Sequence, residues 1–507
     1  MNRRSFLRNT LAGTAAVAVT PAAFLASCGE ITPPATVFAV GGIEVPTPPF
    51  TNEFRTLNVN SASSATITAS KNLLTLIGIT ETFCFGYNAD SIWGPTLKIT
   101  KGNTANITLT NNINETTNLN FRGLTLDASE SDSVETGLEN GGSKTYNFTV
   151  NNRAGLYMYQ PHYQKSAGYQ THLGLGGFFL VEDSEESSLN LPEGELKSTT
   201  IVVSDKRFND QNQMYYGPNP GEQMAGFFGG TILVNGVQGP FKNVSTRIHR
   251  LRIANGSNAR IFNLGLTDIA TNADIPFRII GGDCGLLKTT GGDITTILLA
   301  PGERVDTLVD LSGMSEGTEI MLNSRSFTGG GDYQGSFGFD IMKFVITLAE
   351  TETYSIPDSL SDVTTLTEGD VTGETRNLNI SNGNITQDEA EQNTASMHVI
   401  SGETYDAGTV NYTVNAGTTE KWVFNNTDGK EPRAMHIQGV QFQILSREGG
   451  RGTTKIWERS WKDTVLMLPG ETVTCIVPFT VAPGKYNVVC TNLENSDSGL
   501  MHTIEVV

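Results

Sequence analysis

Short apolar runs and alternating runs follow one another from Thr56 to the C-terminus, and Gly, Asn, Asp and Pro separate them at intervals of about ten residues. Apolar and polar residues alternate with period two in 96–100 and 106–110, which is the pattern of a strand with one buried face. The run 174–181 is apolar throughout, as expected for a strand buried on both faces. This succession of short strands and turns is typical of β-sandwiches and predicts an all-β protein.

Two polar stretches divide the strand-rich sequence, an acidic, Ser-rich one over 183–195 and a second over 350–374. The chain of 507 residues is also too long for a single core, and a prior of roughly 150 residues per domain favours three domains. The segment APGERVD at 300–306 parallels LPGETV at 468–473, which indicates domain duplication. The predicted domains cover residues 55–185, 196–350 and 375–507.

Residues 1–28 are predicted to be an export signal of the twin-arginine type. Arg3 and Arg4 precede an apolar stretch that is too short and too rich in Ala and Thr for a membrane span. The stretch ends in LASCG, the form of a lipoprotein cleavage box, so we expect Cys28 to be lipidated; ordinary cleavage beside an incidental cysteine is the alternative. The Pro-rich segment 29–54 would then be a tether. We therefore expect a periplasmic or cell-surface protein, anchored in a membrane through Cys28.

Charge and motif content exclude several classes of function. The formal net charge of −19 disfavours nucleic acid as a partner. Beyond Cys28, four scattered cysteines do not make a disulfide framework, and no essential bridge is expected. The sequence has no G-x-S-x-G elbow, phosphate loop or H-E-x-x-H helix, so no residue pattern supports a hydrolase. No catalytic residue is assigned.

Three stretches resemble the middle domain of three-domain multicopper oxidases: TILVNG at 231–236, RLRIANGSNAR at 250–260 and APGERVD at 300–306. Similar family sequence occurs at 155–162 and 435–439, and the resemblance extends over residues 55–507. It implies three cupredoxin-like Greek-key β-sandwich domains. It also implies the usual chemistry of that family, in which single electrons taken from a substrate reduce dioxygen to water.

The family binds copper through four His-rich motifs, and most of the corresponding positions here hold other residues. H-W-H-G falls on 120–123, and Y-H-x-H falls on 159–162, where His162 remains. H-x-x-H-x-H falls on 433–438, where His436 remains, and H-C-H with its later His and axial Met falls on 489–500, where only Cys490 remains. The positions that the resemblance marks as degenerate are Asn120, Arg122, Gln160, Arg433, Gln438, Val489, Thr491, Asn495 and Leu500.

These replacements remove the donors that copper needs. A blue-copper site requires two imidazoles and a thiolate, and a cluster that reduces dioxygen requires several more imidazoles. Arg122 would in addition place a positive charge where a cation should bind. We therefore predict a multicopper-oxidase-like protein without a cofactor, acting as a non-catalytic envelope scaffold or interaction protein.

The chain is also similar to the copper-less, twin-arginine-exported cell-division family FtsP (SufI) in 205–208, 233–240 and 436–443. That family is periplasmic and supports septal assembly. Envelope or divisome proteins are therefore the partners that the similarity implies.

The alternative hypothesis is a copper-dependent, multicopper oxidase-type oxidoreductase with an atypical or reduced site. That site would consist of His162, His436 and Cys490, joined by His502 or Met501. If no copper binds, we expect His162 and His436 to be hydrogen-bonded interior histidines between the first and third domains. Cys490 is expected to be either a thiol activated by Arg433 or a small buried apolar residue.

Overall fold

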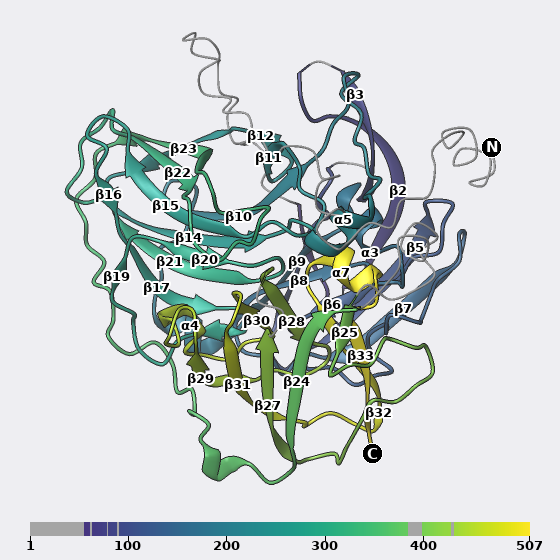
Figure 1. The fold of residues 1–507 in the computed structure, drawn as a ribbon. Helices are drawn as coiled ribbons and strands as arrows, with labels where there is room; N and C mark the ends of the chain where they lie inside the picture. The colour runs from purple at the N-terminus through teal and green to yellow at the C-terminus, as the bar shows by residue number, and fades with distance from the viewer. Residues whose placement is uncertain (1–54, 61–62, 79, 89–90, 384–397, 427–429) are drawn as a thin grey trace.

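The computed structural model describes residues 55–507 apart from 61–62, 79, 89–90, 384–397 and 427–429 (Figure 1). The predicted export signal with Arg3 and Arg4, the predicted lipidation site Cys28 and the tether 29–54 lie outside the described residues. Within the described part, no helix combines the length and the apolar character that crossing a membrane requires. Six β-sheets dominate the molecule, two from each of three consecutive stretches of the chain, which confirms the predicted all-β class.

The first stretch forms a sandwich of a five-stranded sheet, ordered β1-β4-β9-β8-β6, and a four-stranded sheet, ordered β3-β2-β5-β7. The predicted alternation is present in β5, where Ile107 and Leu109 are buried and Thr108 and Thr110 are partly exposed. Phe121 packs edge to face on Phe179 of its own sheet and on Phe148 of the other sheet, and the second contact joins the two sheets. The elements are β1 (Thr56–Asn58), β2 (Ala65–Thr75), β3 (Glu81–Tyr87), β4 (Thr96–Thr100), β5 (Thr104–Asn112), β6 (Asn120–Arg122), β7 (Ser143–Thr149), β8 (Gly155–Gln160), α3 (Ala167–His172) and β9 (Gly177–Glu182).

The second stretch forms an eight-stranded sheet around β10-β14-β21-β17 and a six-stranded sheet around β13-β23-β22-β15. Its core draws on both sheets, for example on Ile253 and Val305 of the first and Leu264 and Phe344 of the second. The elements are α4 (Ser184–Ser188), β10 (Ser198–Lys206), α5 (Pro220–Ala225), β11 (Thr231–Val234), β12 (Val237–Gln238), β13 (Phe241–Ser245), β14 (Ile248–Asn255), β15 (Phe262–Asp268), β16 (Asp274–Ile275), β17 (Phe277–Gly282), β18 (Gly285–Leu286), β19 (Asp293–Ile294), β20 (Ile297–Leu299), β21 (Arg304–Asp310), β22 (Glu319–Ser324) and β23 (Phe339–Leu348).

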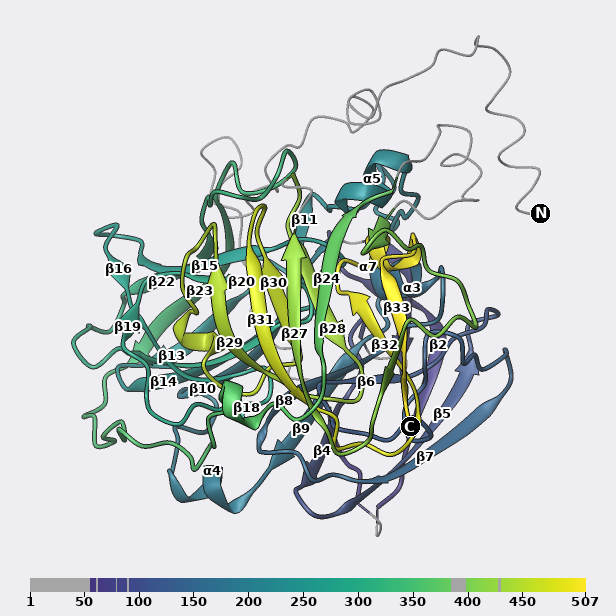
Figure 2. The same cartoon turned by 60° about the horizontal axis from the view of Figure 1, so that its bottom comes forward.

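The third stretch forms two five-stranded sheets, ordered β25-β24-β27-β31-β29 and β26-β33-β32-β28-β30 (Figure 2). Trp422 on the first sheet and Met435 and Cys490 on the second share one core. The elements are η1 (Glu368–Asp370), β24 (Thr375–Asn382), β25 (His398–Ile400), β26 (Tyr412–Val414), β27 (Thr419–Asn426), β28 (Arg433–Ile437), β29 (Gln443–Glu448), η2 (Ile456–Glu458), β30 (Thr464–Met467), β31 (Thr472–Pro478), β32 (Gly484–Cys490), α7 (Leu493–Asp497) and β33 (Met501–Val506).

The predicted repeat forms the same turn in the second and third stretches. Gly302 and Gly470 both have positive φ, 79° and 75°, which a side chain would disfavour. In each turn the following glutamate closes the loop with its carboxylate: Glu303 accepts from the Ala300 amide at 2.7 Å, and Glu471 accepts from the Leu468 amide at 2.9 Å. Equal geometry at equal sequence positions is what duplication predicts.

The acidic stretch expected as a linker contains a short, packed helix. Asp183 caps α4 by accepting from the Glu186 amide at 2.8 Å. Glu185 pairs with Arg153 of the first stretch at 3.0 Å, and Glu186 pairs with Arg250 of the second. The connection is therefore fixed to both of the stretches that it joins.

Three short helices, one from each stretch, lie side by side at a junction (Figure 1). Asp497 at the end of α7 accepts from the amides of Ala167 at 3.2 Å and Gly168 at 2.9 Å, at the start of α3. Asn495 of α7 donates to the carbonyl of Met224 in α5 at 2.8 Å. The candidate site lies at this junction.

Candidate functional site

Strand pairing brings the separate ligand motifs together. In the first stretch β6 pairs with β8, so that Asn120 lies opposite Gln160. In the third stretch β28 pairs with β32, so that His436 lies opposite Val489 and Met435 lies opposite Cys490. The positions predicted from the resemblance therefore meet in space, although their residues have changed.

His162 and His436 lie in the interior between the first and third stretches, each 1% exposed. The ring Nε2 of His162 is 3.0 Å from the Ser496 hydroxyl, and Nδ1 of His436 is 2.7 Å from the Asp463 carbonyl oxygen. Because a carbonyl only accepts, His436 carries its proton on Nδ1, and its Nε2 has no hydrogen-bond partner. Burial is the main cause that lowers the pKa of both imidazoles, and the positive charge of Arg122 lowers it further. The pKa of His162 falls to about 3. Both imidazoles are neutral at physiological pH.

Arg122 lies at a position where the family resemblance implies a copper-binding histidine, and its side chain is 1% exposed. Its Nε and Nη1 have no hydrogen-bond partner in the structure. Burial lowers the pKa of Arg122 to about 10, and the nearby carboxylate of Asp463 opposes that shift. The group is still charged at neutral pH, so the site carries a cation of its own.

The residues at the position that the resemblance implies for a mononuclear copper form a hydrogen-bonded joint. Arg433 donates from Nη1 to the side-chain oxygen of Asn495 at 2.7 Å and from Nη2 to that of Asn382 at 2.8 Å. The Cys490 sulfur lies 3.9 Å from the same Asn495 oxygen, and the Cys490 amide donates to the Leu500 carbonyl at 3.0 Å. Burial raises the pKa of the Cys490 thiol, and Arg433 only partly opposes this. The hypothesis of a thiol activated by Arg433 is therefore wrong; the sulfur is a buried neutral thiol within the core.

The other degenerate positions have ordinary interior roles or unsatisfied donors. Asn120 donates to the Asp132 carbonyl at 3.3 Å, and Val489 packs against Val134. Gln438 and Thr491 are 5% and 1% exposed, and each has a side-chain polar atom without a hydrogen-bond partner. Buried polar atoms of this kind are normally satisfied by ordered water.

His502 and Met501, which the alternative hypothesis adds to the copper site, make other contacts in the structure. The Nδ1 of His502 is 3.0 Å from the Tyr412 hydroxyl, and Met501 packs in a small apolar cluster with Val134 and Val489. Among the residues that the structure describes, no group of three or more His, Cys, Asp and Glu side chains could hold a metal ion. A guanidinium, amides and a valine in place of imidazoles do not fit copper, whose preferred ligands here would be imidazole and thiolate.

Sequence reasoning missed a buried network of ion pairs next to these positions. Lys462 lies 2.7 Å from a carboxylate oxygen of both Asp283 and Glu303, and Arg304 binds the carboxylate of Asp463. Glu303 and Arg304 belong to the repeated segment. Arg304 and Asp463 are 159 residues apart along the chain, and Lys462 and Asp283 are farther apart still, so no local sequence pattern identifies these partners.

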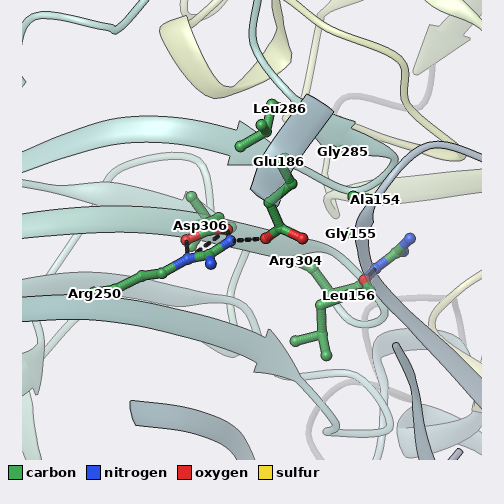
Figure 3. A pocket seen from close by; sticks show the side chains of 11 residues that line it. Ala154, Gly155, Leu156, Glu186, Arg250, Gly285, Leu286, Arg304 and Asp306 are labelled. Carbon is green, nitrogen blue, oxygen red and sulfur yellow. Dashed lines mark hydrogen bonds and ion pairs between the residues drawn. The ribbon is translucent and has the colours of Figure 1, made fainter. Parts of the chain in front are cut away.

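A small cavity lies between the first and second stretches, beside a second buried ion pair (Figure 3). Arg250 lies between Glu186 and Asp306, with its Nε 3.0 Å from the Asp306 carboxylate. The cavity holds about 10 Å³, room for about one water molecule. It cannot admit an organic substrate.

Three two-sheet β units, with the ligand positions gathered where the first and third units meet, define a three-domain cupredoxin protein. The family model described as multicopper oxidase matches residues 372–507, and a second multicopper oxidase model matches residues 69–186. The chain belongs to the multicopper oxidase superfamily, as its sequence suggested, and the predicted cupredoxin-like fold is confirmed.

Relatives of two kinds are similar to this chain. It is 29% identical over 425 residues to the multicopper oxidase mco of Staphylococcus haemolyticus, covering 83% of each chain. It is also 29% identical over 409 residues to the cell division protein FtsP of Photorhabdus laumondii, covering 79% of this chain and 80% of the relative. The solved structure of the McoA multicopper oxidase from Aquifex aeolicus superimposes with a TM-score of 0.81 at 29% identity, over 90% of this chain and 98% of the other. Overall similarity does not separate the two functions, so the site residues must.

Proposed function

We propose that this chain is an exported, non-catalytic scaffold or interaction protein of the cell envelope, built on the multicopper oxidase fold without its copper sites. The observation that carries the proposal is the burial of Arg122 and Arg433, each 1% exposed, at positions where the family resemblance calls for copper-binding imidazoles. One guanidinium lies at the multinuclear position and the other at the mononuclear position.

Guanidinium groups oppose copper in two ways. They remain protonated in proteins and offer no lone pair to a metal, and their charge repels a cation across a poorly screened interior. The only thiol at the ligand positions is Cys490, and burial keeps it neutral by raising its pKa. A neutral thiol and two imidazoles do not provide the donor set for dioxygen reduction.

The proposed location rests on the N-terminal sequence. Arg3 and Arg4 would direct twin-arginine export, and a lipid on Cys28 would anchor the β domains to a membrane through the tether 29–54. The similarity to proteins named for cell division favours envelope or divisome proteins as partners.

Dioxygen uptake tests the proposal. The purified exported chain, supplied with copper, is assayed with phenolic and metal-ion substrates, with the staphylococcal multicopper oxidase as the positive control. We expect no uptake above the rate without protein. Sustained uptake that depends on copper and on this chain would overturn the scaffold role.

A copper-dependent oxidoreductase with a reduced site is the second candidate, and one observation favours it. His162 and His436 interact electrostatically, and each has a ring nitrogen without a hydrogen-bond partner. Two imidazoles could hold a single copper ion. Binding of one copper per chain that is lost in both His162→Ala and His436→Ala would favour this candidate over the scaffold.

A further inference from the structure

Five buried charged side chains link the second and third stretches through the network around Lys462. Asp283, Glu303 and Arg304 come from the second stretch, and Lys462 and Asp463 from the third. All five side chains are at most 1% exposed. The network holds two cations and three carboxylates, so when all are ionised it carries one excess negative charge. An uncompensated charge in such an interior is strongly destabilising.

The end of β6, from the first stretch, lies directly against this network. A Cβ atom added to Gly123 would lie 2.2 Å from Oδ2 of Asp463 and 2.6 Å from Nη2 of Arg304, so only a glycine leaves room for that ion pair. A Cβ atom added to Gly302 would lie 2.7 Å from Nη1 of Arg122. The Arg122 guanidinium therefore reaches the turn that presents Glu303 and Arg304.

We propose that Arg122 is the cation that completes this buried network and so couples the first stretch electrostatically to the second and third. With Arg122 the network has three cations and three carboxylates, and its formal charge is zero. Asp463 and Asp283 are the carboxylates that act favourably on Arg122, while Arg304 acts unfavourably. With Arg122 in place, the network needs no other cation to balance its carboxylates.

A proton on Glu303 is the competing source of neutrality, because burial raises the pKa of that carboxyl and Asp283 adds to the effect. The two explanations predict different responses to the loss of Arg122. If Arg122 neutralises the network, its removal leaves a surplus negative charge that the removal of one carboxylate repairs. If Glu303 is already protonated, its replacement repairs nothing.

A double-mutant cycle in the full-length exported chain tests the proposal. Arg122→Met is expected to lower the unfolding temperature by roughly 5 °C, as expected for a broken buried charge balance in a chain of this size. Glu303→Gln alone is expected to lower it as well, because it leaves a surplus positive charge. In the double variant R122M/E303Q at least half of the R122M loss is expected to return, and Arg122→Lys, which keeps the charge, is expected to stay closer to the wild type.

Arg278 provides the matched control, since its ion pair with Asp293 lies at the surface, with side chains 40% and 50% exposed. R278M is expected to change the unfolding temperature by about 1 °C or less. Additive losses in R122M and E303Q, or an R122M loss no larger than that of R278M, would overturn the proposal. If R122M does not fold, recovery of soluble protein in R122M/E303Q supports the proposal, and failure of both variants contradicts it.

Discussion

Arg433 donates a hydrogen bond of 2.7 Å to the side chain of Asn495, and these two residues stand at positions where the family resemblance places copper-binding histidines. Asn495 in turn donates to the Met224 carbonyl at 2.8 Å. Side chains that would hold a metal in a copper-binding relative here bind each other and a neighbouring helix. At the implied mononuclear position, these contacts form a structural joint between the second and third stretches.

Restoring the imidazoles should restore a mononuclear copper site. The double variant Arg433→His with Asn495→His places two imidazoles beside Cys490, which is the trigonal donor set of blue-copper proteins. We expect it to bind one copper per chain with the intense visible absorption of thiolate-bound copper. The single variant Arg433→His, measured in the same way, should stay colourless, and a colourless double variant with bound copper would show that Cys490 does not lie where a ligand must.

The native cysteines should resist alkylation. Burial raises the pKa of Cys84, Cys284, Cys475 and Cys490, so little thiolate forms at pH 8 and reagents cannot reach it. Mass spectrometry after brief treatment with iodoacetamide should find these residues unmodified in the native protein and modified after unfolding in denaturant. Selective native labelling of Cys490 would restore the reactive-thiol hypothesis.

The buried carboxyls of Glu494 and Asp497 should each contribute less to stability as the pH rises from about 5 to 8. Burial raises the pKa of Glu494 from 4.5 to about 7 and that of Asp497 from 3.8 to about 8. A carboxyl with a raised folded-state pKa holds its proton in the folded chain after the unfolded chain has lost it, so folding becomes less favourable across that interval. For Glu494 the loss is roughly 3 kcal/mol at about 1.4 kcal/mol per pKa unit.

Glu494→Gln checks this pH dependence. It should remove the Glu494 contribution, so that between pH 5 and pH 8 the slope of the unfolding free energy against pH is more positive in the variant than in the wild type, whatever its effect at pH 5. Glu448→Gln, at an exposed position, is the control and should leave the slope unchanged. An equal slope in the wild type and in Glu494→Gln would show that the Glu494 carboxyl does not titrate in this range.

Membrane attachment should depend on Cys28. Cys28→Ser should release the exported chain from the membrane fraction into the soluble envelope fraction, because it removes the predicted lipid attachment site. Replacing Arg3 and Arg4 by Lys should instead keep the chain inside the cell. A Cys28→Ser chain that stays with the membrane would mean that something other than a lipid holds it there.

The sequence predicted those features that depend on a local residue pattern or on a family motif. Alternation identified strands such as β5, and the repeated segment correctly indicated the paired turns at Gly302 and Gly470. The family motifs placed His162 and His436 together, although they lie on different sandwiches. The Asp183 cap and Glu186 also form a local helix-start pattern, although the acidic, Ser-rich composition around them predicts a linker.

Long-range charge balance could not be predicted in the same way. Arg304 and Asp463 are 159 residues apart, and no sequence pattern near either residue indicates its partner. The position of Arg122 was predicted from the resemblance, yet its relation to Asp463 and the Gly302 turn depends on how the sandwiches pack. The protonation state of Cys490 also depends on burial. The family resemblance places Arg433 near the thiol, but only the structure shows that the effect of burial on the thiol pKa exceeds the effect of Arg433.

The most direct test of the central claim is the metal content of the folded, exported chain after growth with added copper. Elemental analysis of the purified protein, together with its visible spectrum, should show no stoichiometric copper and no blue absorption. About four coppers per chain with blue colour, the full complement of a mononuclear site and a three-ion cluster, would contradict the account.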